Sequence, residues 1–353
     1  MKFIIDKSIK DIQTIIPLLK FEEPLKFIFV NREDINNSLL KDASGVIVRA
    51  NKAIDKKLLD ETSIKYVFSP SSGIDHLDID FFEQKKIRYF HAPGCNSVSV
   101  INYVLAVIKI LNDKDYYSLR KEKVGVIGYG NIGKKLCHFF DFFNIAYHAY
   151  DPFVLNSTKE DLIEIKEKCS LLTLHVPLTS KGLHPTICLI DEKFLNETTN
   201  KIIINTSRGN IIDSEAMKKN KNIIFVNDVW PNEPDIEVSQ VKNSFIATPH
   251  IAGHSQNGRM IGVKKILLDL INLISQHSHE LNENITIVKD FYESKLKESI
   301  FSDLEEINNK INILGESKKF KELMENSKNT KEIPKNFMKA RSSHAERLDF
   351  VLP

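Results

Sequence analysis

The segment Val124–Gly133 constrains the fold most strongly, because an apolar stretch runs directly into three glycines spaced as GxGxxG. In this pattern Gly128 permits a tight turn, Gly130 lets the backbone approach a pyrophosphate, and Gly133 lets a helix pack against the strand. Asp151 follows the next apolar stretch, where a carboxylate accepts hydrogen bonds from ribose hydroxyls and repels a 2′-phosphate. The sequence therefore predicts a dinucleotide site that favours NAD over NADP, with a purely structural turn as the alternative.

Short apolar stretches alternate with helical patterns on both sides of this segment. The strands expected before residue 95 are Phe3–Ile5, Phe27–Val30, Gly45–Val48, Tyr66–Phe68 and Arg88–His91. Those expected later are Val124–Ile127, Ala146–Tyr150, Leu171–His175, Ile202–Asn205, Ile223–Asn227 and Phe245–Ala247. Helices are expected between the first strands over Asp6–Leu19, Arg32–Leu39 and Lys52–Leu59. This alternation predicts an α/β fold with two doubly wound, Rossmann-like or flavodoxin-like parallel-sheet domains.

Two other segments complete the expected organisation. Ser97–Ile110 is almost entirely apolar, so we expect a helix buried on several sides that bridges the domains or forms a subunit interface. After residue 280 the apolar residues at 300, 304, 307, 311 and 314 predict one amphipathic helix that ends at a Gly315 C-cap. A polar loop over Asn326–Asn336 and a strand over Asp349–Leu352 follow, which indicates a small α+β C-terminal domain.

Composition excludes several classes of protein. A chain of 353 residues suggests two or three domains, and 49 basic against 47 acidic residues do not favour nucleic acid as a partner. We find no apolar run of bilayer length and no signal-peptide pattern, so no membrane partner is expected. The four cysteines form no CxxC pair, which favours a reducing cytoplasm and gives no reason to expect a metal site.

Three expected strand ends carry polar residues that suit the oxidation of an alcohol. His250 is suited to accept a hydroxyl proton, Glu233 to orient its ring, and Arg208 to hold a carboxylate by paired hydrogen bonds. Because doubly wound sheets bind ligands at the carboxyl ends of their strands, we expect these residues to converge. Taken singly, each has a structural alternative: a packed histidine, a turn glutamate and a helix-capping arginine.

The order and spacing of several motifs resemble the D-isomer-specific 2-hydroxyacid dehydrogenases over roughly residues 45–260. Besides the glycine motif, the resemblance rests on His175–Leu178, Arg208–Gly209, Asp228–Pro234 and Pro249–Gly253. It implies that Arg208 binds the substrate carboxylate, that His250 is the acid/base, and that Glu233 pairs with His250. It also implies a substrate-binding domain of residues 1–95 with 259–280, including a helix over Met260–Gln276. The NAD-binding domain would then be 96–258, and 281–353 a dimerisation domain of a homodimer.

The same resemblance implies which residues bind the cofactor. They are Gly128, Gly130, Asn131, Ile132, Gly133, Asp151, His175, Val176, Thr206, Ser207, Asp228 and Gly253. Two of these have alternatives that the sequence leaves open. His175 either supports the loop under the nicotinamide or simply packs, and Asp228 either contacts the nicotinamide amide or caps its strand.

Narrower features are similar to a member of the family that oxidises a phosphorylated hydroxy acid in pyridoxal 5′-phosphate (vitamin B6) biosynthesis. These features are residues 72–76, 92–96, 113–123, 251–255 and 336–341. The implied substrate-binding residues are Arg49, Ala50, Ser71, Ser72, Gly73, His254 and Arg341. Ala50 and His254 depart from the serine and tyrosine that are usual there. The alternatives are a general D-2-hydroxyacid or phosphoglycerate dehydrogenase and a noncatalytic NAD-binding regulatory protein.

Overall fold

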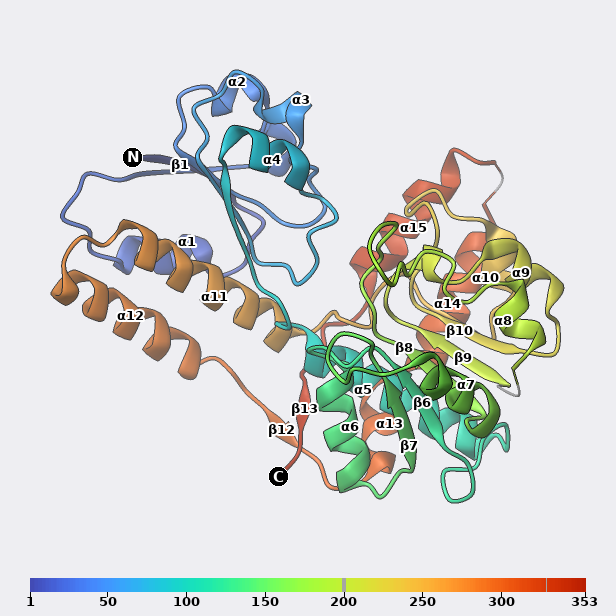
Figure 1. Cartoon of the computed structure of the whole chain (residues 1–353). Helices are drawn as coiled ribbons and strands as arrows, with labels where there is room; N and C mark the ends of the chain where they lie inside the picture. The colour runs from blue at the N-terminus through green and yellow to red at the C-terminus, as the bar shows by residue number, and fades with distance from the viewer. Residues whose placement is uncertain (199–200, 328) are drawn as a thin grey trace. The chain divides into compact units, whose positions relative to one another are not determined.

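Two parallel β-sheets organise the chain, and each is the centre of a separate unit (Figure 1). The computed structural model describes residues 1–198, 201–327 and 329–353. One unit contains Met1–Asn96 and Ser255–Glu298, and the other contains Ser97–His254 and Ser299–Pro353. Every strand expected before residue 250 is present, with its ends within one residue of those expected.

The first unit contains a five-stranded sheet in the order β2-β1-β3-β4-β5. Its strands are β1 (Lys2–Asp6), β2 (Lys26–Val30), β3 (Gly45–Ile47), β4 (Tyr66–Ser69) and β5 (Arg88–His91). The helix expected over Met260–Gln276 is α11 (Gln256–Ile274), which shares one apolar core with β1, β3 and β4 and is followed by α12 (Ser278–Glu293). Figure 1 shows the orange helix α11 next to the blue part of the chain, with α12 alongside α11. At Gly262 a Cβ atom would lie 2.5 Å from the Pro70 carbonyl oxygen, so glycine permits this close approach.

The early helices of this unit are shorter than expected, because polar side chains end or begin them. Asp6 belongs to β1, where its carboxylate accepts a hydrogen bond from the Ser8 N–H at 2.8 Å. Asp55 accepts from the Leu58 N–H at 2.9 Å, so the third helix begins at residue 56 and not at residue 52. The observed elements are α1 (Ile12–Ile15), η1 (Ile16–Leu18), η2 (Arg32–Asp34), α2 (Asn37–Leu40), α3 (Lys56–Leu59) and α4 (Ile79–Lys85).

The second unit contains a six-stranded sheet in the order β11-β10-β9-β8-β6-β7. Its strands are β6 (Val124–Ile127), β7 (Tyr147–Tyr150), β8 (Leu171–Leu174), β9 (Ile202–Asn205), β10 (Ile224–Asn227) and β11 (Ile246–Ala247). The connecting helices are α6 (Gly133–Phe142), α7 (Lys159–Lys168), α8 (Glu192–Asn196), η3 (Gly209–Ile211), α9 (Ser214–Lys219) and α10 (Val238–Asn243). All six strands are parallel, but successive strands are added on one side of β6 up to β7 and on its other side from β8 onward. Ligands of doubly wound sheets bind at this switch point between β6 and β8.

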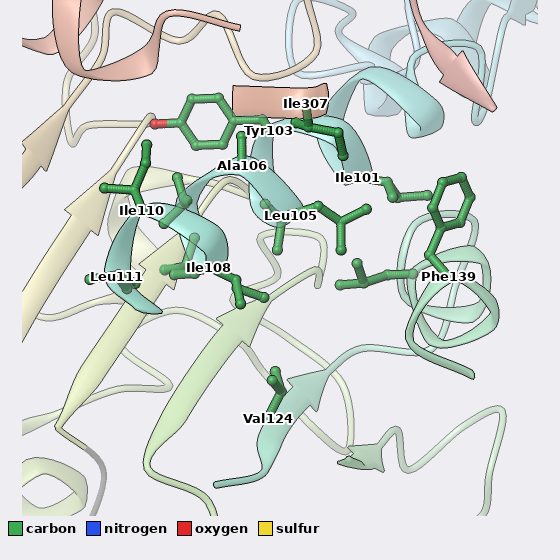
Figure 2. Packing of buried hydrophobic residues seen from close by; sticks show 14 of the residues in the cluster. Ile101, Tyr103, Leu105, Ala106, Ile108, Ile110, Leu111, Val124, Phe139 and Ile307 are labelled. Carbon is green, nitrogen blue, oxygen red and sulfur yellow. The ribbon is translucent and has the colours of Figure 1, made fainter. Parts of the chain in front are cut away.

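The apolar segment after residue 96 is helix α5 (Ser97–Asp113), which is buried over almost its whole length. One side of it packs on the sheet and on α6, and another packs on α13 (Leu304–Lys310) in the C-terminal part. Figure 2 shows Ile101, Leu105 and Ile108 in this interior, with Phe139 of α6 and Ile307 of α13 nearby. The surface expected to bridge domains or subunits is therefore buried within the second unit.

The expectation of a single helix over residues 300–314 is wrong. The chain forms β12 (Ser299–Ile300), α13, α14 (Ile313–Glu325), α15 (Glu332–Ser343) and β13 (Phe350–Val351). Asn312 separates α13 from α14, because its side chain accepts a hydrogen bond from the Gly315 N–H at 3.0 Å. Gly315 thus lies in the first turn of α14 and is not a C-cap.

The C-terminal residues are divided between the two units. Residues 281–298 lie in the first unit, and 299–353 pack with the second, where β12 pairs with β13 in parallel. The polar loop expected over Asn326–Asn336 ends early because α15 begins at Glu332, and residue 328 within it lies outside the described residues. Among the helices in the described ranges, we find none with the length and hydrophobicity needed to cross a membrane.

Candidate active site

The glycine loop between β6 and α6 has the geometry that a pyrophosphate requires. Gly128 has a φ of 98°, and a Cβ there would lie 2.5 Å from the His175 carbonyl oxygen. A Cβ at Gly133 would lie 1.9 Å from the Gly128 carbonyl oxygen, whereas nothing lies within 4 Å of a Cβ at Gly130. Two of the glycines therefore permit tight backbone packing, and the third leaves the open space that a ligand needs.

Asp151 follows β7 and is tied to the same loop. Its Oδ2 accepts a hydrogen bond from the Tyr129 N–H at 2.8 Å, and its Oδ1 accepts from the Phe153 and Val154 N–H groups at 2.9 and 3.0 Å. A carboxylate offers about four acceptor sites, so a ribose hydroxyl still has a place on it. Asn131 and Ile132 continue the loop, with Asn131 exposed and Ile132 at the N-cap of α6.

The ends of β8 and β9 supply the next expected cofactor residues. Burial lowers the pKa of His175 to about 3, so its ring is neutral, and its Nε2 lies 3.0 Å from the Thr173 hydroxyl. The Ser207 hydroxyl donates to the Leu174 carbonyl oxygen and ties the two strand ends together. Val176 lies beside Gly128, and Thr206 is buried next to Ser207. The strand ends thus meet at the switch point, as their sequence positions predict.

Arg208 lies in the loop after β9, which touches the loop after β10. Its Nη1 donates to the Ser207 carbonyl oxygen at 2.7 Å. A Cβ at Gly209 would lie 1.9 Å from the Trp230 carbonyl carbon and 2.1 Å from the Pro231 nitrogen. The arginine-bearing loop is therefore in backbone contact with the loop that carries Glu233.

Glu233 and His250 form a hydrogen-bonded pair at the ends of β10 and β11. The Oε2 atom of Glu233 lies 2.7 Å from Nδ1 of His250, and its Oε1 accepts from the Trp230 N–H at 2.8 Å. Burial acts to raise the pKa of Glu233, but the His250 charge and hydrogen bond, the Trp230 N–H and the Arg341 charge together lower it. The carboxylate therefore stays ionised and holds the ring through Nδ1.

Asp228 is buried and caps the loop that follows His250. Its Oδ1 accepts from the Thr248 hydroxyl at 2.6 Å and the Ile251 N–H at 2.8 Å, and its Oδ2 accepts from the Ala252 N–H at 2.8 Å. Of the two roles that the sequence left open, these contacts favour the strand-end cap. Contact with a nicotinamide amide stays a prediction, as does the cofactor role of Gly253 in the same loop.

His254 and Arg341 are electrostatically coupled to the Glu233–His250 pair. The His254 ring stacks on His344 with centroids 5.5 Å apart. Burial is the main reason that the pKa of His254 lies well below its usual value, and the Arg341 charge adds to it. The charge of Arg341 also lowers the pKa of Glu233.

The expected substrate residues of the first unit lie in two loops. Arg49 and Ala50 follow β3, with Ala50 exposed, and residues 71–73 follow β4. The Ser72 hydroxyl accepts from the Gly94 N–H at 3.1 Å, and the Ser71 carbonyl oxygen accepts from the Ala92 N–H at 3.0 Å. These bonds fix the second loop against the residues after β5.

The sequence did not reveal a buried polar network next to the Glu233–His250 pair. The Tyr103 hydroxyl lies 2.7 Å from the Thr248 hydroxyl, which donates to Asp228, and Trp230 donates its indole N–H to the Thr248 carbonyl oxygen at 2.9 Å. Arg347, close to the C-terminus, also reaches this region. Tyr103 lies within an apolar helix pattern and Arg347 lies within no motif. The one available sequence signal was the polar hydroxyl of Tyr103 on an otherwise apolar helix, because a buried polar atom needs a hydrogen-bond partner.

The sequence of the second unit matches a known family model. Residues 109–252 match the NAD-binding domain of the D-isomer-specific 2-hydroxyacid dehydrogenases. The chain is 37% identical over 284 residues to an erythronate-4-phosphate dehydrogenase of Wigglesworthia glossinidia brevipalpis, covering 78% of this chain and 74% of that protein. It is 33% identical to one of Bacteroides fragilis, covering 73% of this chain and 76% of that protein.

Solved structures support the fold. An NAD⁺-bound 3-phosphoglycerate dehydrogenase of Entamoeba histolytica has a TM-score of 0.59 and 23% identity, covering 82% of this chain and 94% of its own. A D-2-hydroxyisocaproate dehydrogenase has a TM-score of 0.58 and 20% identity, covering 78% and 97%. The sequence likenesses show that the chain belongs to the erythronate-4-phosphate dehydrogenase family of NAD-dependent D-isomer-specific 2-hydroxyacid dehydrogenases, and the glycine cradle and the Glu233–His250 pair agree with this membership.

Proposed function

We propose that this NAD-dependent oxidoreductase oxidises 4-phospho-D-erythronate at C2 to 2-oxo-3-hydroxy-4-phosphobutanoate, a step of vitamin B6 biosynthesis. The observation that carries the proposal is the 2.7 Å pair between Glu233 and His250, with Arg208 on the neighbouring strand end. A noncatalytic NAD-binding protein has no need of this pair, which weighs against that alternative.

The pair supplies the proton chemistry of the reaction. With its Nδ1–H donated to Glu233, His250 has Nε2 left to accept the proton of the C2 hydroxyl. The ionised Glu233 then stabilises the imidazolium that forms and keeps its ring in place. Bound NAD supplies the acceptor for the hydride that leaves C2.

The second unit carries the proposed cofactor-binding residues. The backbone of Gly128–Gly133 is suited to hold the pyrophosphate at the start of α6, and Asp151 the adenosine ribose. The strand-end residues His175, Thr206 and Ser207 are proposed to line the nicotinamide half. This assignment rests on the open space at Gly130 and on the adjacency of β6, β8 and β9.

The substrate has one carboxylate and one phosphate, and different residues are proposed for each. Arg208 is suited to the carboxylate, because a guanidinium donates two parallel hydrogen bonds to it. The loops of the first unit that carry Arg49 and residues 71–73, with Arg341 and His254 of the second unit, are proposed for the rest of the substrate. Ala50 supplies no hydroxyl donor, so the phosphate depends more heavily on the arginines.

The test is an assay of NADH formation with the purified full chain. It compares 4-phospho-D-erythronate with 3-phospho-D-glycerate, D-glycerate and D-lactate, each with and without a 2-oxo acid that can reoxidise a retained cofactor. We expect the first compound to give the highest kcat/KM. A preference for 3-phospho-D-glycerate or an unphosphorylated acid would refute the substrate assignment, and turnover of none of them would refute the enzymatic function.

We also propose that the protein is a homodimer formed through its C-terminal elements. Exposed apolar side chains support this: Ile300 on β12, Leu314 on α14 and Met338 on α15 are 64%, 42% and 39% exposed. Light scattering after size-exclusion chromatography should give twice the mass of the chain for the wild-type protein. Ile300→Glu should shift the measured mass toward that of a monomer. A monomeric wild-type protein at micromolar concentration would refute the dimer. The cytoplasmic location stays a prediction.

A further inference from the structure

A partly buried guanidinium reaches the loop that follows His250. Arg347 lies between α15 and β13, and its Nη2 donates hydrogen bonds to the carbonyl oxygens of Ile251 and Ala252, the first at 3.1 Å. The same nitrogen lies 3.3 Å from the Ser99 carbonyl oxygen at the start of α5. Arg347 therefore connects the C-terminal segment, helix α5 and the loop after β11.

The opposite edge of this loop is held by Asp228. Its carboxylate accepts the N–H groups of the same two residues, Ile251 and Ala252, at 2.8 Å each. Both residues are thus held by the buried Asp228 carboxylate on one edge and the partly buried Arg347 on the other, and the Ile251 carbonyl oxygen also accepts from the His254 N–H at 2.9 Å. Charged partners make the stronger hydrogen bonds of proteins, so the loop is fixed from both edges.

The charge of Arg347 is balanced inside this network. Burial lowers the pKa of its guanidinium, and the charges of Asp228 and Asp349 oppose that effect. The Ser99 hydroxyl donates to Asp349 at 2.8 Å, which places a second carboxylate in the same set of contacts. A partly buried cation with compensating carboxylates is costly to disturb from either side.

His250 has a particular need for such support. Its φ is 58°, in the left-handed region that non-glycine residues rarely adopt. A residue in that region is held only where its surroundings over-determine the conformation. The His250 N–H donates to the Asp228 carbonyl oxygen at 2.7 Å, so one side of the residue is fixed by β10 and the other by the loop that Arg347 holds.

We propose that Arg347 is a positioning residue for His250: it fixes the carbonyl oxygens of Ile251 and Ala252, while Asp228 fixes their N–H groups. This inference rests on the proposed acid/base role of His250. It assigns to the C-terminal segment a part in the chemical step, which Arg347 plays through its hydrogen bonds to the loop after His250.

The experiment compares Arg347→Met and Arg347→Lys with the wild-type full chain. Methionine keeps the length of the side chain without donors or charge, whereas a lysine ammonium offers three donors to the same carbonyl oxygens. We expect the methionine variant to lower kcat about 100-fold, because a displacement of about 1 Å at a catalytic group has that effect. The lysine variant should recover most of the loss, and the KM for NAD should change less than about threefold in both.

Two controls separate the possible outcomes. Lys339→Gln removes an exposed positive charge from α15 and should keep wild-type kcat. His250→Asn tests the function itself, so a fully active His250→Asn would refute the acid/base role and not merely the role of Arg347.

A cavity of about 350 Å³ borders Arg347, so about 50 mM guanidinium chloride should partly restore an Arg347→Ala variant, in which the vacated space can hold the ion.

The proposal would be overturned by a folded Arg347→Met variant with kcat within about threefold of wild type. It would also be overturned if the lysine and methionine variants lost activity equally, because that result indicates packing and not hydrogen bonding. If Arg347→Met does not fold, Arg347→Gln, which keeps a polar side chain without charge, is compared with the lysine variant by the same criteria.

Discussion

Replacing Glu233 by glutamine tests the reasoning about the Glu233–His250 pair most directly. The glutamate accepts two hydrogen bonds, from His250 Nδ1 and from the Trp230 N–H. Glutamine has only one oxygen. If that oxygen stays on Trp230, the amide N–H₂ faces His250 and forces the proton onto Nε2, where the base is needed. If it turns to His250, two donors face each other at Trp230.

The size of the effect follows from the lost charge. Two opposite charges about 4 Å apart attract by about 4 kcal/mol at an effective dielectric constant of about 20. That is nearly three powers of ten in rate, at about 1.4 kcal/mol for each tenfold. Because the His250 and Glu233 side chains are 30% and 18% exposed, water screens part of the attraction. We expect kcat to fall roughly 100- to 1,000-fold.

The assay measures steady-state kcat for 4-phospho-D-erythronate and, separately, the Kd for NAD by calorimetry. The Kd should change less than about twofold, since Glu233 lies outside the glycine cradle. Glu237→Gln is the matched control, because Glu237 is exposed and solvent screens its ion pair with Lys218. A kcat within fivefold of wild type for Glu233→Gln would contradict the proposed role of the pair.

Three further predictions concern the cofactor loop and the strand ends. Gly133→Ala should weaken NAD binding at least tenfold in calorimetry, because its Cβ would lie 1.9 Å from the Gly128 carbonyl oxygen; unchanged affinity would contradict the cradle. Gly209→Ala should lower the free energy of unfolding by about 1–3 kcal/mol in urea titrations, since its Cβ overlaps the Trp230 backbone; an unaltered midpoint would argue against that contact. The folded-state pKa of His175 is about 3, below its unfolded value of about 6.5, so stability should be full above about pH 6.5 and decline as the pH falls toward 3. His175→Gln should make that decline shallower in urea titrations between pH 4 and 8, and an equal slope would contradict it.

Local spacing made part of this molecule predictable. The glycine loop and Asp151 could be located because a turn, a helix start and the next strand end lie within one continuous stretch. Arg208, Glu233 and His250 could be grouped because parallel strands end at one edge of the sheet. The distances between their side chains could not be predicted, since these depend on how the loop after β9 packs on the loop after β10 at Gly209.

Other features depend on contacts that no local pattern encodes. The helix expected over residues 300–314 failed because the Asn312 side chain competes for the backbone at the point where the apolar spacing continues. Arg347 meets the loop after His250 across some 95 residues of sequence, with no motif around it. The sequence alone is equally consistent with Asp228 as a nicotinamide ligand or as a strand-end cap, because the choice depends on the positions of the Ile251 and Ala252 N–H groups.

The burial of α5 has a consequence for how the protein is made. Phe301, Ile307 and Phe350 belong to the same core as this helix, so the second unit is assembled from stretches on either side of residues 255–298. During translation, α5 and β6 leave the ribosome long before the C-terminal residues that cover them. Until about residue 350 is synthesised, the nascent chain exposes an apolar surface, and chaperones will have their greatest opportunity to bind it then. An expression fragment that ends near residue 298 will meet the same exposure permanently.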